Sequence, residues 1–354
     1  MSETSFKRLL PPPLSTLAIG SVPFQEPKEA LDLMARTLDI PASPQMVQVS
    51  PWEDMILGAI SGVPAVMVDE GRNVTIAQEG REDALAQFYE KYFSSDLDYF
   101  ALGEKSSLGF EAFIARAAGD PSFGKTFLKT QVVGPLTFGQ SVRVQGAQAL
   151  VDSPDLLEAV ALAIGFKTAW LAKRIRETGR RPIVFIDEPG LTGYGSAFST
   201  LSPQTVMDTL GASITAARQG GEVLIGCHVC GNTDWGLLSR VGLDIINFDA
   251  DANLCTVCLY PKEIQAFLEK GGLLAFGIVP TRDFTEETKP GHLAMLVRDG
   301  WATLASKNID KGLLAERTLL TSACGLGSLA PEKATAILEA LPEVSEILAE
   351  SIQR

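Results

Sequence analysis

The stretch EVLIGCHVCGNTDW, residues 222–235, places two thiols and an imidazole at the end of an apolar run. These groups belong to Cys227, Cys230 and His228. Thiolates and imidazole nitrogens are the protein ligands that zinc prefers, and a pair of thiols can also carry out redox chemistry. The spacing therefore indicates half of a structural zinc knuckle, a redox pair, or an open metal site that supports a reaction.

A second pair, Cys255 and Cys258, could complete a four-cysteine knuckle with the first. Alternation along a strand argues against this, because His228 and Cys230 share one face while Cys227 points the opposite way, into the helix layer. A redox pair usually lies at a helix N-terminus, whereas Gly-Asn-Thr follows here. Plain burial is a further alternative, since free cysteine is a common core residue. We favour the open metal site.

Composition narrows the class of protein. The 354 residues include 46% apolar and 21% charged side chains, which is ordinary for a folded protein with a large core. The net charge of −13, from 43 acidic and 30 basic residues, would repel a nucleic-acid backbone. No window resembles a membrane span, and the start MSETSFKRLLPPP lacks the apolar core of a signal peptide. We expect a cytoplasmic protein whose five cysteines are free thiols.

Short β-branched runs alternate with longer helical patterns, as a parallel sheet with helical crossovers requires. The helical patterns include residues 153–179, 202–221 and 261–272. Eight runs are predicted as strands: residues 16–22, 46–50, 127–134, 182–188, 222–229, 244–250, 273–279 and 317–325. Eight such units predict an α/β fold of the (β/α)8 TIM-barrel type.

We predict one domain over residues 1–354, with residues 1–13 loosely ordered and an inserted β-hairpin near residues 63–76. The competing topology is an open, doubly wound sheet. The barrel is favoured because no glycine-rich phosphate-binding fingerprint follows the first predicted strand.

In a barrel of this kind, reactive groups gather where the strands end. His228 and Cys230 end the fifth predicted strand, Asp249 ends the sixth, and Cys324 lies at the end of the eighth. These side chains, distant in sequence, should converge at one mouth. One imidazole, two thiolates and at most one carboxylate are ligands suited to zinc rather than to a hard cation.

These residues resemble the zinc-binding segments of the cobalamin-independent methionine synthases. The resemblance covers nearly the whole chain and includes the wider superfamily of uroporphyrinogen decarboxylase and the methylcobamide:coenzyme M methyltransferases. The segments that carry it are HVC (228–230), NFDAD (247–251), TSACGLGSL (321–329), AIGSVP (18–23), VFIDEPGL (184–191), KTQVVGPLTF and FGIVPT.

The resemblance implies a ligand set and a substrate. His228, Cys230 and Cys324 would bind zinc, and Asp249 stands where the family has a glutamate. The substrate would be homocysteine. Its carboxylate would bind at the segment Ile19, Gly20 and Ser21, and its amino group at Asp187 and Glu70.

Two departures from the family concern the methyl donor. The full-length enzymes have two barrels, of which this chain matches only the catalytic one, and a family histidine is replaced within GIVPTRD. Methyltetrahydrofolate needs a proton on its leaving nitrogen, whereas cobalt(I) leaves a methylcorrinoid without one. We therefore expect a methylcorrinoid donor, methylcobalamin or a corrinoid protein partner, and methionine as product.

Other readings stay open at this point. The donor could be methyltetrahydrofolate, or the acceptor could be coenzyme M, although a sulfonate has no ammonium to pair with Asp187. A uroporphyrinogen decarboxylase-like enzyme would need several basic residues at the mouth, where Arg282 is the main cation. A metal-binding or corrinoid-carrying module without catalysis is a further alternative, but the Asp-x-His-x-x-Gly carrier signature is absent from the sequence.

Overall fold

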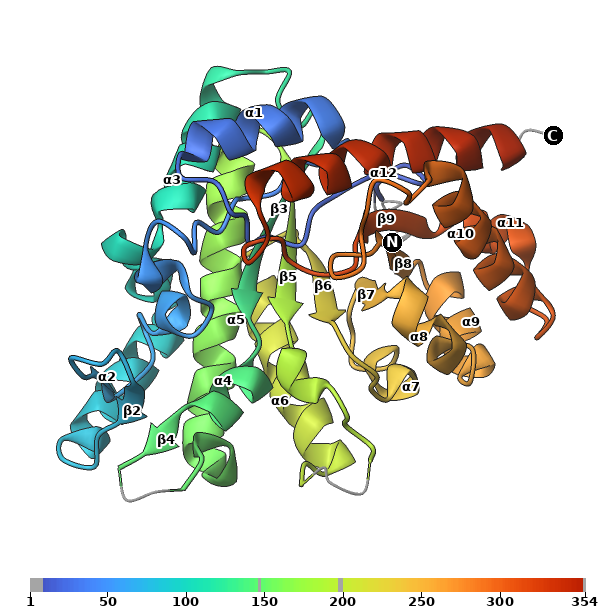
Figure 1. Cartoon of the computed structure of the whole chain (residues 1–354). Coiled ribbons are helices and arrows are strands. Elements are labelled where there is room, and N and C mark those ends of the chain that lie inside the picture. Colours follow the sequence, from blue (N-terminus) through green and yellow to red (C-terminus); the bar gives the residue numbers. More distant parts are fainter. Residues whose placement is uncertain (1–8, 146–147, 197–199, 353–354) are drawn as a thin grey trace, which may run out of the picture.

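A computed structural model describes residues 9–145, 148–196 and 200–352. Six parallel strands form one curved sheet, in the same order in space as along the chain (Figure 1). They are β3 (Phe127–Val133), β5 (Arg181–Asp187), β6 (Leu224–Val229), β7 (Ile245–Asp249), β8 (Leu273–Val279) and β9 (Thr318–Ser322). All six strands were predicted, and the chain is an α/β protein.

The α-helices lie on the outside of this sheet and connect its strands (Figure 1). Within the described residues they are α1 (Pro27–Thr37), α2 (Arg81–Phe93), α3 (Leu108–Gly119), α4 (Pro135–Ser141), α5 (Pro154–Glu177), α6 (Pro203–Gln219), α7 (Trp235–Leu238), α8 (Ala250–Val257), α9 (Pro261–Glu269), α10 (Pro290–Ala305), α11 (Lys311–Glu316) and α12 (Pro331–Ile352). Many begin with proline at the first helical position, where its missing N–H leaves no hydrogen bond unmade. In the described residues no helix has the length and apolarity that a membrane span requires.

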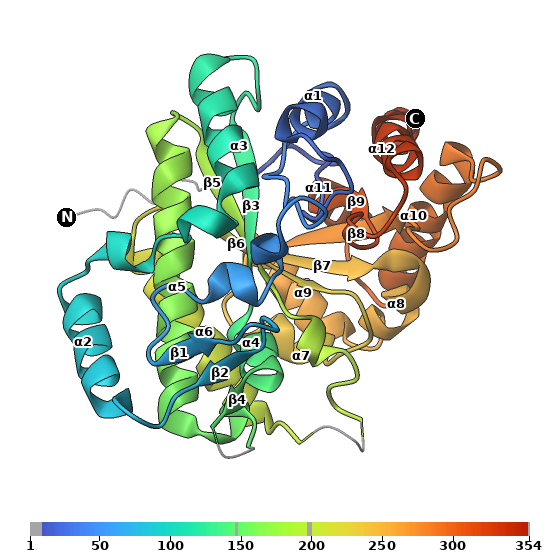
Figure 2. The ribbon, with the colours of Figure 1, turned by 60° about the vertical axis from the view of Figure 1, so that its left-hand side comes forward.

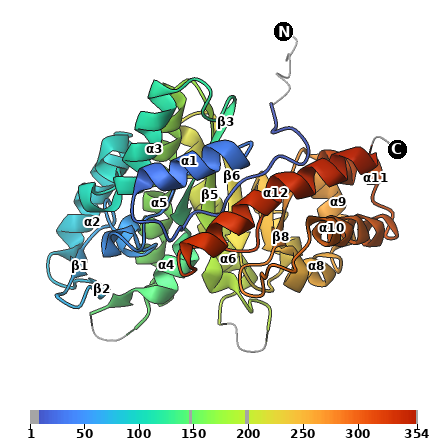
Figure 3. The same ribbon diagram turned by 45° about the horizontal axis from the view of Figure 1, so that its top comes forward.

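Short 3-10 helices occupy several of the loops: η1 (Pro51–Glu53), η2 (Leu57–Ala59), η3 (Leu97–Phe100), η4 (Glu104–Ser106), η5 (Leu150–Asp152) and η6 (Pro189–Leu191). The first and last helices of the chain, α1 and α12, lie side by side on the same side of the sheet (Figure 3). An ion pair of 3.0 Å between Arg36 and Glu339 joins them. The first and last helices of the chain are thereby packed together.

For two of the eight predicted strands the prediction is wrong, because these segments do not form regular strands. Residues 16–21 form only isolated parallel bridges, from Thr16 to β9 and from Leu17 and Ser21 to the segment 40–45. That segment in turn bridges β3. The strand predicted over 46–50 is instead a turn, in which the N–H groups of residues 49 and 50 donate to one carbonyl, that of residue 46.

Proline accounts for the irregularity of the segment 40–45. Pro41 and Pro44 lack the N–H that a ladder needs, so hydrogen bonds to the neighbouring strand cannot repeat along it. Backbone contacts still cross the opening between β9 and β3, including Ser43 N–H to the Lys129 carbonyl at 2.8 Å. A six-stranded curved sheet with two bridged segments thus stands where eight strands were expected.

The predicted hairpin is confirmed. β1 (Val66–Val68) and β2 (Val74–Ile76) pair antiparallel, and β2 also pairs with β4 (Arg143–Val144). This small sheet lies apart from the main one, next to α4 and α5 (Figure 2). Loose order was predicted for residues 1–13, of which residues 1–8 lie outside the described part of the chain.

The curved sheet separates two apolar cores. The outer core lies between sheet and helices and includes Cys227, which is 1% exposed, so this thiol points away from the sheet's inner face as predicted. The inner core is a smaller cluster on the concave face, to which the strands contribute alternate residues. Gly226 belongs to this face because a Cβ there would lie 2.3 Å from the ring of Phe185. Residues that follow the same alternation toward the strand ends reach the site.

Candidate metal centre and adjoining cavity

His228, Cys230 and Cys324 come together at the carboxyl ends of β6 and β9. Their potential ligand atoms all lie within 4.8 Å of one another, and within the described ranges no other group of three or more such residues does so. His228 is buried, whereas both thiols are partly accessible. One buried nitrogen and two thiols can supply three of the four ligands that a tetrahedral zinc site requires.

The imidazole of His228 is oriented by Asn247, which stands opposite it in the register of β6 and β7. The Asn247 amide nitrogen donates to the Ala275 carbonyl at 2.9 Å and to Thr321 Oγ1 at 2.8 Å. Its oxygen therefore faces His228 Nδ1, at 2.5 Å, and must accept a hydrogen bond from it.

This network assigns the tautomer of His228. With the proton on Nδ1, the Nε2 nitrogen carries a lone pair, and it is buried with no hydrogen-bond partner among the residues the structure describes. An orphaned acceptor costs stability unless a ligand satisfies it. A neutral imidazole held by an outer hydrogen bond is the usual form of a metal-binding histidine. The residues present thus fit a bound zinc ion.

The pKa values of the two thiols are shifted in opposite directions. A hydrogen bond from Cys324, with further contributions from His228 and Thr192, lowers the pKa of Cys230 to about 4. The same interaction with Cys230, together with burial, raises the pKa of Cys324. Burial opposes the charged form of His228, but its interactions with Cys230 and Asp187 outweigh burial and raise the pKa of the imidazole. A metal ion binds the neutral ring, so binding at Nε2 would displace any proton held there.

Asp249 does not belong to this cluster. Its carboxylate caps α8 by accepting the Ala252 N–H at 3.1 Å, so it acts as an N-cap residue. Cys255 and Cys258, the second pair of the alternative four-cysteine knuckle, are also separate from the cluster. Cys255 is exposed and Cys258 is buried at the end of α8, so the described coordinates bring together no four-cysteine knuckle.

Asp187 ends β5 and is paired in register with His228. It is 7% exposed, and its Oδ1 atom is buried without a hydrogen-bond partner in the described structure. Burial raises the pKa of this carboxyl to about 6, although Lys129 and His228 partly oppose the shift. An unpaired buried carboxylate oxygen next to the metal cluster is suited to a cationic group of a ligand.

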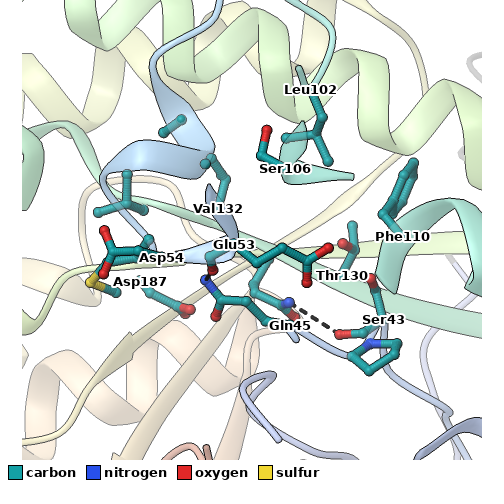
Figure 4. Close-up of a pocket in the computed structure, with 16 residues that line it drawn as sticks. Ser43, Gln45, Glu53, Asp54, Leu102, Ser106, Phe110, Thr130, Val132 and Asp187 are labelled. Atoms are coloured by element: carbon teal, nitrogen blue, oxygen red, sulfur yellow. Dashed lines mark hydrogen bonds between the residues drawn. The ribbon is translucent and has the colours of Figure 1, made fainter. Parts of the chain in front are cut away.

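A cavity adjoins Asp187 (Figure 4). Acidic groups of Glu53 and Asp54 and the amides of Gln45 and Gln131 line it together with Asp187. The apolar part of the lining includes Met55, Leu102, Phe110 and Val132. Glu53 also fixes the loops around the cavity, because its carboxylate accepts the N–H groups of Met46 and Gly109.

Ser21 lies beside the loop that carries Cys324. Its hydroxyl accepts the Gly327 N–H at 3.3 Å, and its carbonyl accepts the Leu326 N–H at 2.8 Å. Gly325 is required for this approach, because a Cβ there would lie 2.2 Å from Ser21 Oγ. The segment Ile19, Gly20 and Ser21 is thus held against the loop that follows β9. The contacting residues of this loop come directly after Cys324 in the chain.

Glu70 is exposed in the turn between β1 and β2, and it is not among the residues that line the cavity. Sequence reasoning missed Asn247 and Lys129. Both are polar residues within predicted strands, in IINFD and FLKTQVV respectively. A buried polar side chain in a strand has to find a partner, so this signal was available.

Comparison of the sequence with protein-family models and with curated proteins finds no match. Among solved structures, the fold is similar to that of a B12-independent methionine synthase from Shewanella sp. W3-18-1 in complex with selenomethionine. The TM-score is 0.61 at 15% identity, over 96% of this chain and 99% of that one. A mannanase from Cellulomonas fimi aligns at a TM-score of only 0.38, 14% identity and 92% and 76% of the two chains, which supports no argument. At 15% identity the likeness to the methionine synthase structure concerns the fold alone.

Proposed function

We propose that this chain is a zinc-dependent methyltransferase that methylates the thiol of homocysteine to form methionine. The observation that carries the proposal is the convergence of His228, Cys230 and Cys324 within 4.8 Å, with the Nε2 lone pair of His228 unpaired. The fold likeness to a methionine synthase structure supports it. Asp187 lies beside the cluster, and its unpaired carboxylate oxygen can bind the ammonium group of an amino-acid substrate.

The three clustered residues would hold the zinc ion and leave one position for a substrate atom. Zinc bound there would keep a coordinated thiol deprotonated at neutral pH, in the form that acts as a nucleophile. Asn247 keeps Nδ1 of the imidazole protonated and so directs Nε2 into the site. In this proposal Asp249 serves only as a helix cap.

The amino-acid part of the substrate would be bound by the chain itself. The unpaired Oδ1 of Asp187 would accept the ammonium group, and the backbone of the segment Ile19, Gly20 and Ser21 would receive the carboxylate. Binding both the ammonium and the carboxylate would fix the position of the substrate thiol relative to the cluster, so that the thiol is oriented for reaction. Glu70, exposed on the hairpin, has no part in this arrangement.

We further propose a methylcorrinoid donor. The substrate thiolate would attack the methyl carbon in line, a carbon–sulfur bond would form, and the electron pair of the broken carbon–cobalt bond would stay on cobalt as cobalt(I). No general acid is needed for this step. The sequence has two histidines; the one outside the cluster, His292, is exposed in the first turn of α10. His292 is not among the residues that line the cavity beside Asp187, so it is not placed to protonate the leaving nitrogen of a methyltetrahydrofolate donor.

The experiment combines metal analysis with a donor and acceptor assay. Purified wild type should hold about one zinc per chain, whereas Cys324→Ser should lose most of it, because one of three protein ligands is removed. Homocysteine should be methylated with methylcobalamin, and coenzyme M, which lacks an ammonium group, should be a poor acceptor. Turnover with methyltetrahydrofolate but none with methylcobalamin would overturn the donor. Wild type without zinc, or without activity toward homocysteine, would overturn the function.

Asp187→Ala separates substrate binding from metal binding. The variant should raise the KM for homocysteine while zinc content stays near that of wild type, since Asp187 is outside the group of potential ligands. Unchanged kinetics would remove Asp187 from the site.

A further inference from the structure

Lys129 is a charged side chain in an apolar place. It lies in the middle of β3 and is 0% exposed, on the concave face whose other members form the inner apolar core. It makes no ion pair with any residue in the described part of the chain, and its ammonium lies 4.7 Å from the centroid of the Phe185 ring. Burying an ammonium is costly, so packing alone would favour an apolar residue here.

The hydrogen bonds of Lys129 point to its use. Nζ donates to the Ile19 carbonyl and to Gln131 Oε1, the latter at 2.9 Å. The Gln131 amide nitrogen then donates to the Ser43 carbonyl at 3.1 Å. One ammonium thus connects β3 with both bridged segments, 16–21 and 40–45, that lack a regular ladder of their own.

Gly20 is packed directly on the Gln131 amide. A Cβ at Gly20 would lie 2.6 Å from Gln131 Cδ and 2.8 Å from its Oε1. The peptide that follows Ile19 therefore rests on a side chain whose position Lys129 sets. Gln131 also lines the cavity together with Asp187, so the side chain that supports Gly20 is part of the cavity wall.

We propose that Lys129 is a positioning residue that fixes the segment Ile19, Gly20 and Ser21 and the Gln131 amide as the carboxylate side of the amino-acid pocket. This inference rests on the proposed function. In this proposal the positive charge of Lys129 also attracts the substrate carboxylate, while Asp187 binds the ammonium. Burial lowers the pKa of Lys129 to about 8, with Asp187 opposing the shift, so most of the ammonium is retained at neutral pH.

The test is Lys129→Met, which keeps length and removes the charge and both hydrogen bonds. We expect the KM for homocysteine to rise about 10-fold to 100-fold, the range for losing hydrogen bonds to a charged group, with kcat within about threefold. Zinc content should stay at the wild-type level. The KM for 3-mercaptopropylamine, which keeps thiol and amine but has no carboxylate, should be unchanged.

Lys167→Met is the matched control. Lys167 is also 0% exposed, but its ammonium donates to Ser61, Phe100 and Ala101, none of which belongs to the proposed site. This variant should lose stability without a change in either KM. If Lys129→Met does not fold, Lys129→Gln removes the charge but keeps an N–H donor. It should raise the KM for homocysteine by a smaller factor, again without a change for 3-mercaptopropylamine.

The outcomes separate the two proposals. Wild type that fails to methylate homocysteine overturns the function and this inference with it. Active wild type together with an unchanged KM in Lys129→Met overturns the positioning role alone. An equal rise in KM for homocysteine and 3-mercaptopropylamine also overturns it, because the effect would then not concern the carboxylate.

Discussion

Removing the acceptor that orients His228 should weaken zinc binding without touching a ligand. In Asn247→Ala the Nδ1–H group loses its partner, and nothing then holds the imidazole with Nε2 toward Cys230 and Cys324. Loss of such outer contacts costs about 10-fold to 100-fold in metal affinity. This range corresponds to about 1.4–2.7 kcal/mol.

A second variant separates the acceptor from the amide. Asn247→Asp keeps an oxygen for Nδ1–H, so zinc affinity should stay within about tenfold of wild type. Its other oxygen, however, would face the Ala275 carbonyl and the Thr321 hydroxyl, whose own hydrogen goes to the Ser322 carbonyl at 2.8 Å. Unfavourable pairing of buried acceptors should lower the free energy of unfolding by about 1–3 kcal/mol.

The assay is zinc affinity by competition with a chromogenic chelator, accompanied by urea unfolding of the zinc-free chains. Asn253→Ala is the matched control: this asparagine is 4% exposed on α8, and its amide nitrogen has no hydrogen-bond partner in the described structure. Its zinc affinity should equal that of wild type. Our assignment of the His228 tautomer fails if Asn247→Ala binds zinc as tightly as Asn253→Ala does.

Further outcomes concern the metal ligands, a buried lysine and a buried glutamate. Cys230→Ser should lose most bound zinc in atomic absorption measurements, whereas Cys258→Ser should keep it, because Cys258 lies outside the cluster. Burial lowers the pKa of Lys167 to about 7, so between pH 7 and its ordinary value of 10.5 the unfolded chain binds more protons than the folded one. The contribution of Lys167 to the free energy of unfolding is therefore fully present above pH 10.5 and is lost as the pH falls toward 7. The urea midpoint of wild type should rise more between pH 7.5 and 9.5 than that of Lys167→Met. Parallel curves for the two proteins would contradict this expectation. Glu53→Gln should lower the free energy of unfolding by about 1–3 kcal/mol, since an amide cannot accept both N–H groups that Glu53 now binds, and an unchanged urea midpoint would exclude that role.

Much of the site was determined by the sequence alone. Strands buried on both faces read as continuous β-branched runs, so β3 and β5–β9 could be predicted, and polar residues at their ends had to meet at one edge. The alternation of side chains along β6 separated His228 and Cys230 from Cys227 before any coordinates were known. The predicted hairpin likewise followed from two short runs and a polar turn between them.

Tertiary structure decided the remainder. Residues 16–22 and 46–50 could form strands only if neighbouring segments paired with them. The structure instead pairs the segment 40–45, just before the second predicted strand, with residues 16–21 and with β3. Local sequence could not show whether Asp249 binds metal or caps α8, because both uses suit a carboxylate after a strand. The hydrogen bonds of Asn247 and Lys129 join residues from segments far apart in the chain. Such contacts are set by how the strands align in space, and no local pattern encodes that alignment.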